Sequence, residues 1–278
     1  MKLGIIGLAG CGKSAVFDAL THDLSEPGQK KESRIGTVRV PDSRIDKLSR
    51  MYNPRKTIYA QVEYFLPGVM GQNMEKQKDQ GTWTQVRDCQ AFIHVIRNFN
   101  IFGGEAPDPS ADFAALNQEL VLSDLLVIEK RLERLAHDSK RGNKANPEEL
   151  ALLHECLKQL ENENPLRNFP EIAGAPLLRG YAFLSAKPML VLFNNEDEDA
   201  SFPDVGDLTE KEECMVIRGK LEQELAQMSA EEAKEFLAEF GIQASAMDRV
   251  IHRSYALLGL ISFFTVGEDE VRAWTIRK

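Results

Sequence analysis

The chain has 278 residues, 43% of them hydrophobic and 28% charged, so it can form one large domain or two modest ones around an ample core. Its net charge of −9 argues against a broad nucleic-acid surface, and we expect neither membrane association nor sequence-specific DNA binding. No apolar run approaches the roughly 20 residues that span a bilayer, and no signal-peptide cleavage site follows the N-terminus. The four scattered cysteines form no CxxC pair, which indicates a reduced, cytoplasmic protein without an obvious zinc site.

A phosphate-binding motif opens the chain. Residues 3–6 predict a buried strand, residues 15–20 have helical apolar spacing, and the sequence GLAGCGKS at 7–14 between them matches G-x-x-x-x-G-K-[ST] in full. Glycines let backbone N–H groups surround a phosphate, and the following helix points its positive end at the same anion. Lys13 can reach the β- and γ-phosphates, and the Ser14 hydroxyl can bind Mg²⁺. The alternative is a glycine-rich turn that binds nothing.

Apolar periodicity predicts the elements that follow. Two helical patterns around a turn at 142–147 predict a helical hairpin, and buried runs predict further strands of a central sheet. In chain order, the predicted elements are a strand at 58–65, a strand at 91–96, helices at 116–136 and 148–160, a strand at 189–193, helices at 236–240 and 247–260, and strands at 261–266 and 271–276.

Several distinctive stretches occur in a fixed order along the chain. They are residues 36–42 and 44–48, 86–97 (VRDCQAFIHVIR), 120–125 and 129–135, 186–188, and 257–261 continuing to 270–276. Over nearly the whole chain these stretches resemble the YchF family, a branch of the Obg-related P-loop GTPases.

The resemblance implies an α/β fold in three parts. These are a Ras-like P-loop NTPase domain with a mainly parallel central sheet (1–118 and 181–258), an inserted antiparallel helical hairpin (119–180) and a short C-terminal β-hairpin remnant of a TGS domain (259–278). It further implies a cytoplasmic protein that binds a purine nucleotide, GTP or ATP, with Mg²⁺ and that associates with the ribosome or a protein partner. The hairpin is then either plain scaffold or a docking arm.

The resemblance also implies a set of site residues. Lys13 is the catalytic residue and Ser14 the metal ligand. The expected nucleotide contacts are Gly10, Cys11, Gly12, Lys13, Ser14, Ala15, Asn194, Asp197 and Lys220.

Base recognition is expected after the strand at 189–193, where the family has N-x-x-E. This chain has Asn194 and Asp197, and the shorter carboxylate suits a guanine edge, whereas Asn195 and Glu198 offer a second register. Lys220 stands where the family packs a lysine on the base. The choice between ATP and GTP stays open here, and an acidic surface loop is the alternative interpretation.

Three departures from the family bear on hydrolysis. GTPases bind Mg²⁺ through a D-x-x-G motif, but alignment on Gly68 puts Phe65 at the aspartate position, and Glu63 would lie about 6–7 Å back along the strand. The polar switch segment at 21–35 lacks the family's landmarks, and the nearest later threonine, Thr37, is expected on the next strand. The region at 69–84 keeps few landmarks.

These departures predict slow or impaired hydrolysis, because each lost preorganised contact commonly costs about 10²–10³ in rate. The first hypothesis is therefore a slow Mg²⁺-dependent NTPase. The second is a pseudo-NTPase adaptor that docks a partner through its helical arm, and the third is a scaffold that binds no nucleotide. His94 is predicted as a core residue, His22 as a candidate general base, and Cys11 as a packing residue rather than a redox thiol.

Overall fold

The computed structural model describes residues 1–23, 32–68, 83–239, 242 and 245–278. Its contacts divide the chain into two compact units, one of residues 1–69, 89–109 and 189–278 and one of residues 70–88 and 110–188. The second unit is longer than the insertion expected at 119–180, and the C-terminal strands belong to the first unit. The finer division into three parts stays a prediction.

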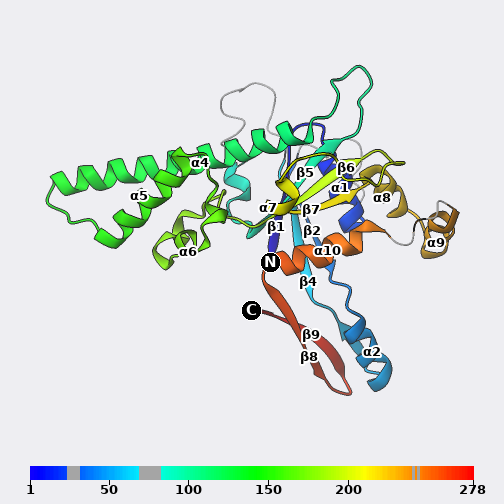
Figure 1. Cartoon of the computed structure of the whole chain (residues 1–278). Helices are drawn as coiled ribbons and strands as arrows, with labels where there is room; N and C mark the ends of the chain where they lie inside the picture. The colour runs from blue at the N-terminus through cyan, green and yellow to red at the C-terminus, as the bar shows by residue number, and fades with distance from the viewer. Residues whose placement is uncertain (24–31, 69–82, 240–241, 243–244) are drawn as a thin grey trace. The chain divides into compact units, whose positions relative to one another are not determined.

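The first unit is built on a six-stranded sheet with strand order β2-β4-β1-β5-β6-β7 (Figure 1). Only the β2–β4 pair is antiparallel, which confirms the predicted α/β fold with a mainly parallel sheet. All of β6 and the first six residues of β5 are buried, as is usual for parallel strands covered on both faces. The strands are β1 Lys2–Ile6, β2 Arg34–Arg39, β4 Gln61–Leu66, β5 Ala91–Asn98, β6 Met189–Asn195 and β7 Glu213–Ile217.

Six helices of the first unit are described. Apolar side chains of α1 and α10 join the strands in one core cluster. The helices are α1 Lys13–Thr21, α2 Ser43–Tyr52, α7 Leu208–Lys211, α8 Gly219–Leu225, α9 Ala230–Glu239 and α10 Ala246–Leu257.

A second, three-stranded sheet has the order β3-β9-β8, with β3 at Lys56–Ile58, β8 at Leu260–Val266 and β9 at Glu270–Arg277. The single strand predicted at 58–65 is therefore two strands in two sheets, and its imperfect alternation reflects this break at residues 59–60. The predicted C-terminal hairpin is present, and β3 adds a third strand to it. Because isolated hairpins are marginal in water, this added strand stabilises it.

The second unit holds the predicted helical hairpin, with both helices longer than expected. The long helix α4 spans Pro109–Lys140 and α5 spans Pro147–Glu161, with Asn146 capping α5 through the backbone N–H of Glu148 at 3.0 Å. The two helices share one apolar cluster. Short helical turns follow: η2 Leu166–Asn168, α6 Pro170–Ala173 and η3 Pro176–Tyr181. Across the described residues, we find no helix with both the length and the apolar character needed to cross a membrane.

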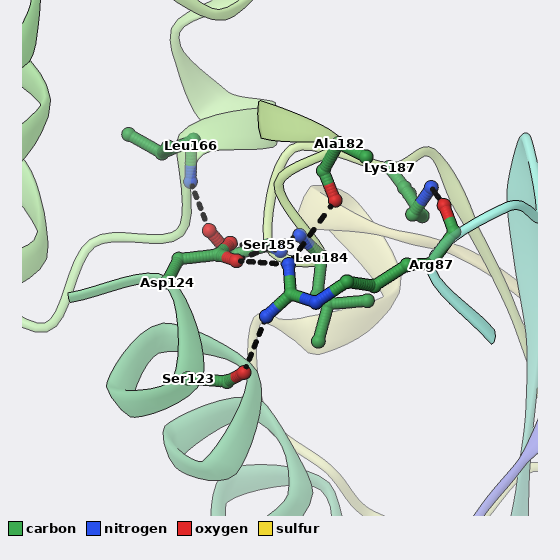
Figure 2. A network of polar contacts seen from close by, with 8 residues as sticks. All are labelled: Arg87, Ser123, Asp124, Leu166, Ala182, Leu184, Ser185 and Lys187. Atoms are coloured by element: carbon green, nitrogen blue, oxygen red, sulfur yellow. Dashed lines mark hydrogen bonds and ion pairs between the residues drawn. The ribbon is translucent and has the colours of Figure 1, made fainter. Parts of the chain in front are cut away.

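A buried carboxylate ties α4 to the returning chain of the second unit (Figure 2). Asp124 is fully buried and accepts hydrogen bonds from the backbone N–H groups of Leu184 at 2.9 Å and Ser185 at 2.7 Å. The Arg87 guanidinium lies 3.6 Å from the same carboxylate and donates to Ser123 at 3.0 Å. Burial raises the pKa of Asp124, while its two amide donors and Arg87 act in the opposite direction.

A second polar cluster in this unit gives a pH-dependent prediction. Glu149 of α5 accepts from Arg131 of α4 at 2.8 Å and from the Tyr181 hydroxyl at 2.5 Å, and these bonds lower its pKa. A carboxyl whose folded pKa is lowered stabilises the fold above its unfolded pKa of about 4.5 and loses that contribution as the pH falls through the folded value. Because Arg131 is 37% exposed, we expect Glu149→Gln to cost only about 0.5–1 kcal/mol at pH 7.

Urea unfolding of the two proteins at pH 7 and pH 3 measures this difference. We expect the gap between wild type and Glu149→Gln to close towards pH 3. Glu129→Gln, at an exposed position of α4, is the matched control. An equal gap at both pH values would contradict the assignment.

Candidate nucleotide-binding site

The predicted phosphate loop connects β1 to α1 at the carboxyl edge of the parallel sheet. Its backbone approaches its neighbours closely. A Cβ on Gly7 (φ +151°) would come 2.4 Å from the Val95 carbonyl oxygen, and one on Gly12 (φ +98°) would come 2.2 Å from Asn194 Nδ2. Both positions therefore require glycine, and the loop presents main chain rather than side chains to its surroundings.

Donor groups converge at the end of this loop. Gly12 is the N-cap of α1 and provides no side-chain cap, and the first helical turn contains no acidic residue. The amides and dipole of this helix end therefore stay available to an anion. The Lys13 ammonium bends back over the loop and donates to the carbonyls of Gly7 at 2.9 Å and Leu8 at 2.7 Å. An ammonium and a helix N-terminus at one place suit a phosphate group.

Asn194 joins this loop to the segment expected to recognise the base. Its side chain is 4% exposed at the carboxyl end of β6. Its Nδ2 donates to the Cys11 carbonyl at 3.1 Å, and its Oδ1 accepts from the backbone N–H of Gly219 at 2.8 Å. Asn194 thus connects the phosphate loop to the start of α8, and a Cβ on Gly219 would come 2.7 Å from Oδ1.

Asp197 lies beside the same helix. Its Oδ1 accepts from the backbone N–H of Leu221 at 3.2 Å, and its Oδ2 lies 3.6 Å from the Lys220 ammonium. The Lys220 side chain is 75% exposed. Asp197 and Lys220, both predicted to contact the base, are therefore neighbours. Asn194 connects α8, the helix that contains Lys220, to the phosphate loop.

Asn195, the first residue of the alternative N-x-x-E register, has other partners than the phosphate loop. Asn195 Nδ2 donates to the Ser201 carbonyl at 2.7 Å and its Oδ1 accepts from Asn98 at 2.9 Å. Asn195 therefore holds the segment after β6 in place, whereas Asn194 contacts the loop.

Replacing Asn194 with alanine tests this connection. The variant leaves the buried Gly219 N–H and Cys11 carbonyl without their partner, so we expect the free energy of unfolding to fall by about 1–3 kcal/mol. Asn143→Ala, at an exposed turn residue, should change it by less than about 0.5 kcal/mol. Denaturant unfolding measures both, and equal losses would contradict a connecting role for Asn194.

Comparison with known proteins decides the family. The chain is 34% identical over 300 residues to the ribosome-binding ATPase YchF of Bacillus subtilis, and this match covers 100% of the chain and 81% of that protein. It is also 34% identical to the YchF protein of Escherichia coli O157:H7, with 99% and 80% covered. The chain belongs to the YchF family. The structure of the Schizosaccharomyces pombe YchF GTPase agrees, with a TM-score of 0.81 and 26% identity over 100% of this chain and 80% of that one. No family model matches the chain.

The expected metal position of this YchF-family chain, at Ser14, offers few ligands. Ser14 lies half-buried in the first turn of α1, directly after Lys13. Among the described residues no group of three or more His, Cys, Asp or Glu side chains could hold a metal ion. A magnesium ion bound to substrate phosphates needs only one or two protein oxygens, so the Ser14 hydroxyl fits that requirement.

An apolar side chain stands where the alignment on Gly68 expects the D-x-x-G aspartate. Phe65 is 5% exposed in β4, and the Lys2 ammonium lies 4.0 Å from its ring centroid. Glu63 does not substitute for an aspartate there. It pairs in register with Lys2, about 16 Å back along the sheet from Gly7, and its carboxylate lies 3.6 Å from the N-terminal amine.

The switch segments are only partly described. Thr37 lies on β2, as predicted, and is exposed opposite Glu63. The predicted loop at 21–35 falls largely, and the region at 69–84 almost wholly, outside the described residues.

His22, His94 and Cys11, which the sequence offers as possible reactive groups, lie in places that do not suit such a role. His94 is 1% exposed within β5, which confirms its predicted core position. His22 ends α1, about 13 Å from the loop at the other end of this nine-residue helix, so it is badly placed as a general base. Cys11 is 1% exposed and fills space below the loop, where a Cβ on Gly7 would meet its sulfur at 2.7 Å.

An ion-pair cluster behind the loop was missed by sequence reasoning. Asp18 of α1 is 4% exposed and accepts from Arg34 of β2 at 2.7 Å and from Gln223 of α8 at 2.8 Å. The Arg34 guanidinium also lies 4.4 Å from the Phe17 ring centroid. The only sequence signal was an acid within an otherwise apolar helical stretch, because the partners are far away along the chain.

Proposed function

We propose that this chain binds a purine nucleoside triphosphate, GTP or ATP, at the carboxyl ends of β1 and β6. The observation that carries the proposal is the convergence of the glycine-lined loop, the uncapped N-terminus of α1 and Lys13, joined through Asn194 to the segment of Asp197 and Lys220. The relatives' names, ATPase and GTPase, support the same ligand class.

The proposed roles follow from the chemistry of each group. Backbone amides of the loop bind the phosphates, the Lys13 ammonium leaves the loop carbonyls for the β- and γ-phosphates, and Asp197 and Lys220 contact the base. The Ser14 hydroxyl would hold Mg²⁺, which would supply positive charge to offset that of the phosphates. The residues proposed to contact the nucleotide are Gly10, Cys11, Gly12, Lys13, Ser14, Ala15, Asn194, Asp197 and Lys220.

Hydrolysis is proposed to be slow and Mg²⁺-dependent. Lys13 would stabilise negative charge on the γ-phosphate in the transition state, but Phe65 offers no oxygen at the usual second metal contact. Phe65 also favours the second candidate, an adaptor that binds nucleotide without turnover and docks a partner through α4 and α5.

Association with the ribosome is proposed by similarity. Relatives that are 30–34% identical carry the name ribosome-binding ATPase. On this basis we propose a cytoplasmic protein that contacts the ribosome or a ribosome-bound protein.

Calorimetric titration with ATP and GTP, each with and without Mg²⁺, tests nucleotide binding. We expect at least one triphosphate to bind, and at 100 times its Kd to raise the free energy of unfolding by about 2.7 kcal/mol. If none of the four combinations gives a heat of binding or a thermal shift, the proposal is refuted.

Single-turnover hydrolysis separates the two candidates. Slow phosphate release that Lys13→Ala abolishes identifies an enzyme. Tight binding without release over many hours identifies the adaptor.

A further inference from the structure

We propose that the outer edge of β7 is a docking site for an extended acidic segment of a partner protein, which adds to the sheet as a further strand. β7 ends the strand order, and within the described residues it pairs with a strand on one side only, through β6. Such an edge exposes a row of backbone donors and acceptors. Five residues of strand extend for about 16 Å, enough to pair with a segment of similar length.

A groove of about 440 Å³ lies beside this edge. Its apolar lining comes from Met215 and Val216 of β7, Ala246 of α10 and Phe202 of the preceding loop. Phe202 is 54% exposed, although its ring makes an edge contact with Phe193 in the core. An added strand could place alternate apolar side chains in this groove, since successive side chains of a strand point to opposite faces.

Most of the polar side chains that line the groove are basic. Arg218, Arg249, His252 and Arg253 all border the groove. Arg253 pairs with Glu213 at 2.9 Å, whereas Arg249 makes no ion pair to any described residue. The one acidic lining residue, Glu222, is 2% exposed and accepts from Ser245 and the Ala246 N–H.

The charge at the groove is thus opposite to the chain's net charge of −9. This local excess of arginine selects an acidic partner. Nucleic acid is the less suitable occupant, because its binding uses neither a strand edge nor an apolar groove.

The probe for strand addition is a fluorescein-labelled decapeptide whose odd residues alternate between valine and aspartate and whose even residues are all threonine, so that valine and aspartate share one face of the strand. Fluorescence anisotropy with the full chain should detect binding, while the same peptide with lysine for aspartate should not bind. Two further peptides carry N-methyl groups on either the odd or the even residues. Because only alternate N–H groups of a strand face the sheet, one methylated set should lose binding and the other keep it.

Charge reversal locates the site on the protein. The double variant Arg249→Glu with Arg253→Glu should weaken the valine–aspartate peptide about tenfold or more. The matched control is Arg134→Glu with Arg141→Glu, two exposed arginines of the second unit, and it should leave affinity unchanged. Circular dichroism checks that each variant is folded.

Three results would overturn the proposal. Equal effects of the two methylated sets would show charge attraction without strand pairing. Equal weakening by both double variants would show unspecific binding. Binding of an oligouridine that the groove variant alone abolishes would identify a phosphate surface instead.

Discussion

Replacing Lys13 with alanine is expected to weaken the binding of ATP or GTP by about 100-fold or more. The ammonium sits over the glycine loop, held by the carbonyls of Gly7 and Leu8, and no other lysine follows the loop directly. Loss of one partner from a shielded, charge-assisted contact commonly costs about 2–5 kcal/mol. The two loop hydrogen bonds contribute less to folding, so stability without nucleotide should fall by only about 1–2 kcal/mol.

Calorimetry with the variant measures the affinity, and Lys220→Ala is the matched control. The Lys220 side chain is 75% exposed beside Asp197, so its removal should weaken binding less than about fivefold. If Lys13→Ala binds nucleotide like wild type, the polyphosphate lies elsewhere. If both variants lose affinity equally, the two lysines have no separate roles.

The largest loss of stability is expected from Asp124→Ala in the second unit. Removal of this carboxylate leaves the buried N–H groups of Leu184 and Ser185 without acceptors and the Arg87 guanidinium without its anion (Figure 2). Breaking a buried pair by removing one partner costs about 3–5 kcal/mol.

Hydrogen exchange at the Leu184 and Ser185 amides gives a local measure. Both should exchange at least about 100-fold faster in Asp124→Ala, since opening becomes easier by more than about 3 kcal/mol. The Leu192 amide in β6 of the first unit is the internal control. Asp124→Asn keeps one acceptor oxygen and should lose less. Unchanged protection at 184 and 185 would show that other contacts hold this segment.

The phosphate loop could be predicted because its requirements are local. Gly7, Gly12 and Lys13 follow one another at fixed spacing, and each residue type answers a constraint of backbone or charge that the short segment itself imposes. The same holds for the helices of the second unit, where apolar periodicity predicted both elements. Both helices were predicted too short. At their N-terminal ends each begins at a proline, at 109 and 147, and Asn146 caps the second helix.

What escaped prediction depends on distant contacts. The break at residues 59–60 separates two strands only because β9, near the C-terminus, pairs with β3. The spacing from Pro188 favoured Asn194 over Asn195, but the contacts of Asn194 with Gly219 and Cys11 join segments far apart in the chain and could not be predicted. The partners of Asp18 lie 16 and 205 positions away, beyond the reach of any local pattern.

The interruption of the first unit has a consequence for synthesis of the chain. Residues 110–188 are synthesised before β6 and β7, so the helical unit can begin to pack while β5, already paired with β1 on one side, still lacks β6 on the other. Completion of the sheet then requires pairing across roughly a hundred positions, the kind of long-range closure that slows folding. Until β6 is synthesised, the nascent N-terminal half therefore carries β5 with one unpaired edge, and unpaired strand edges favour aggregation.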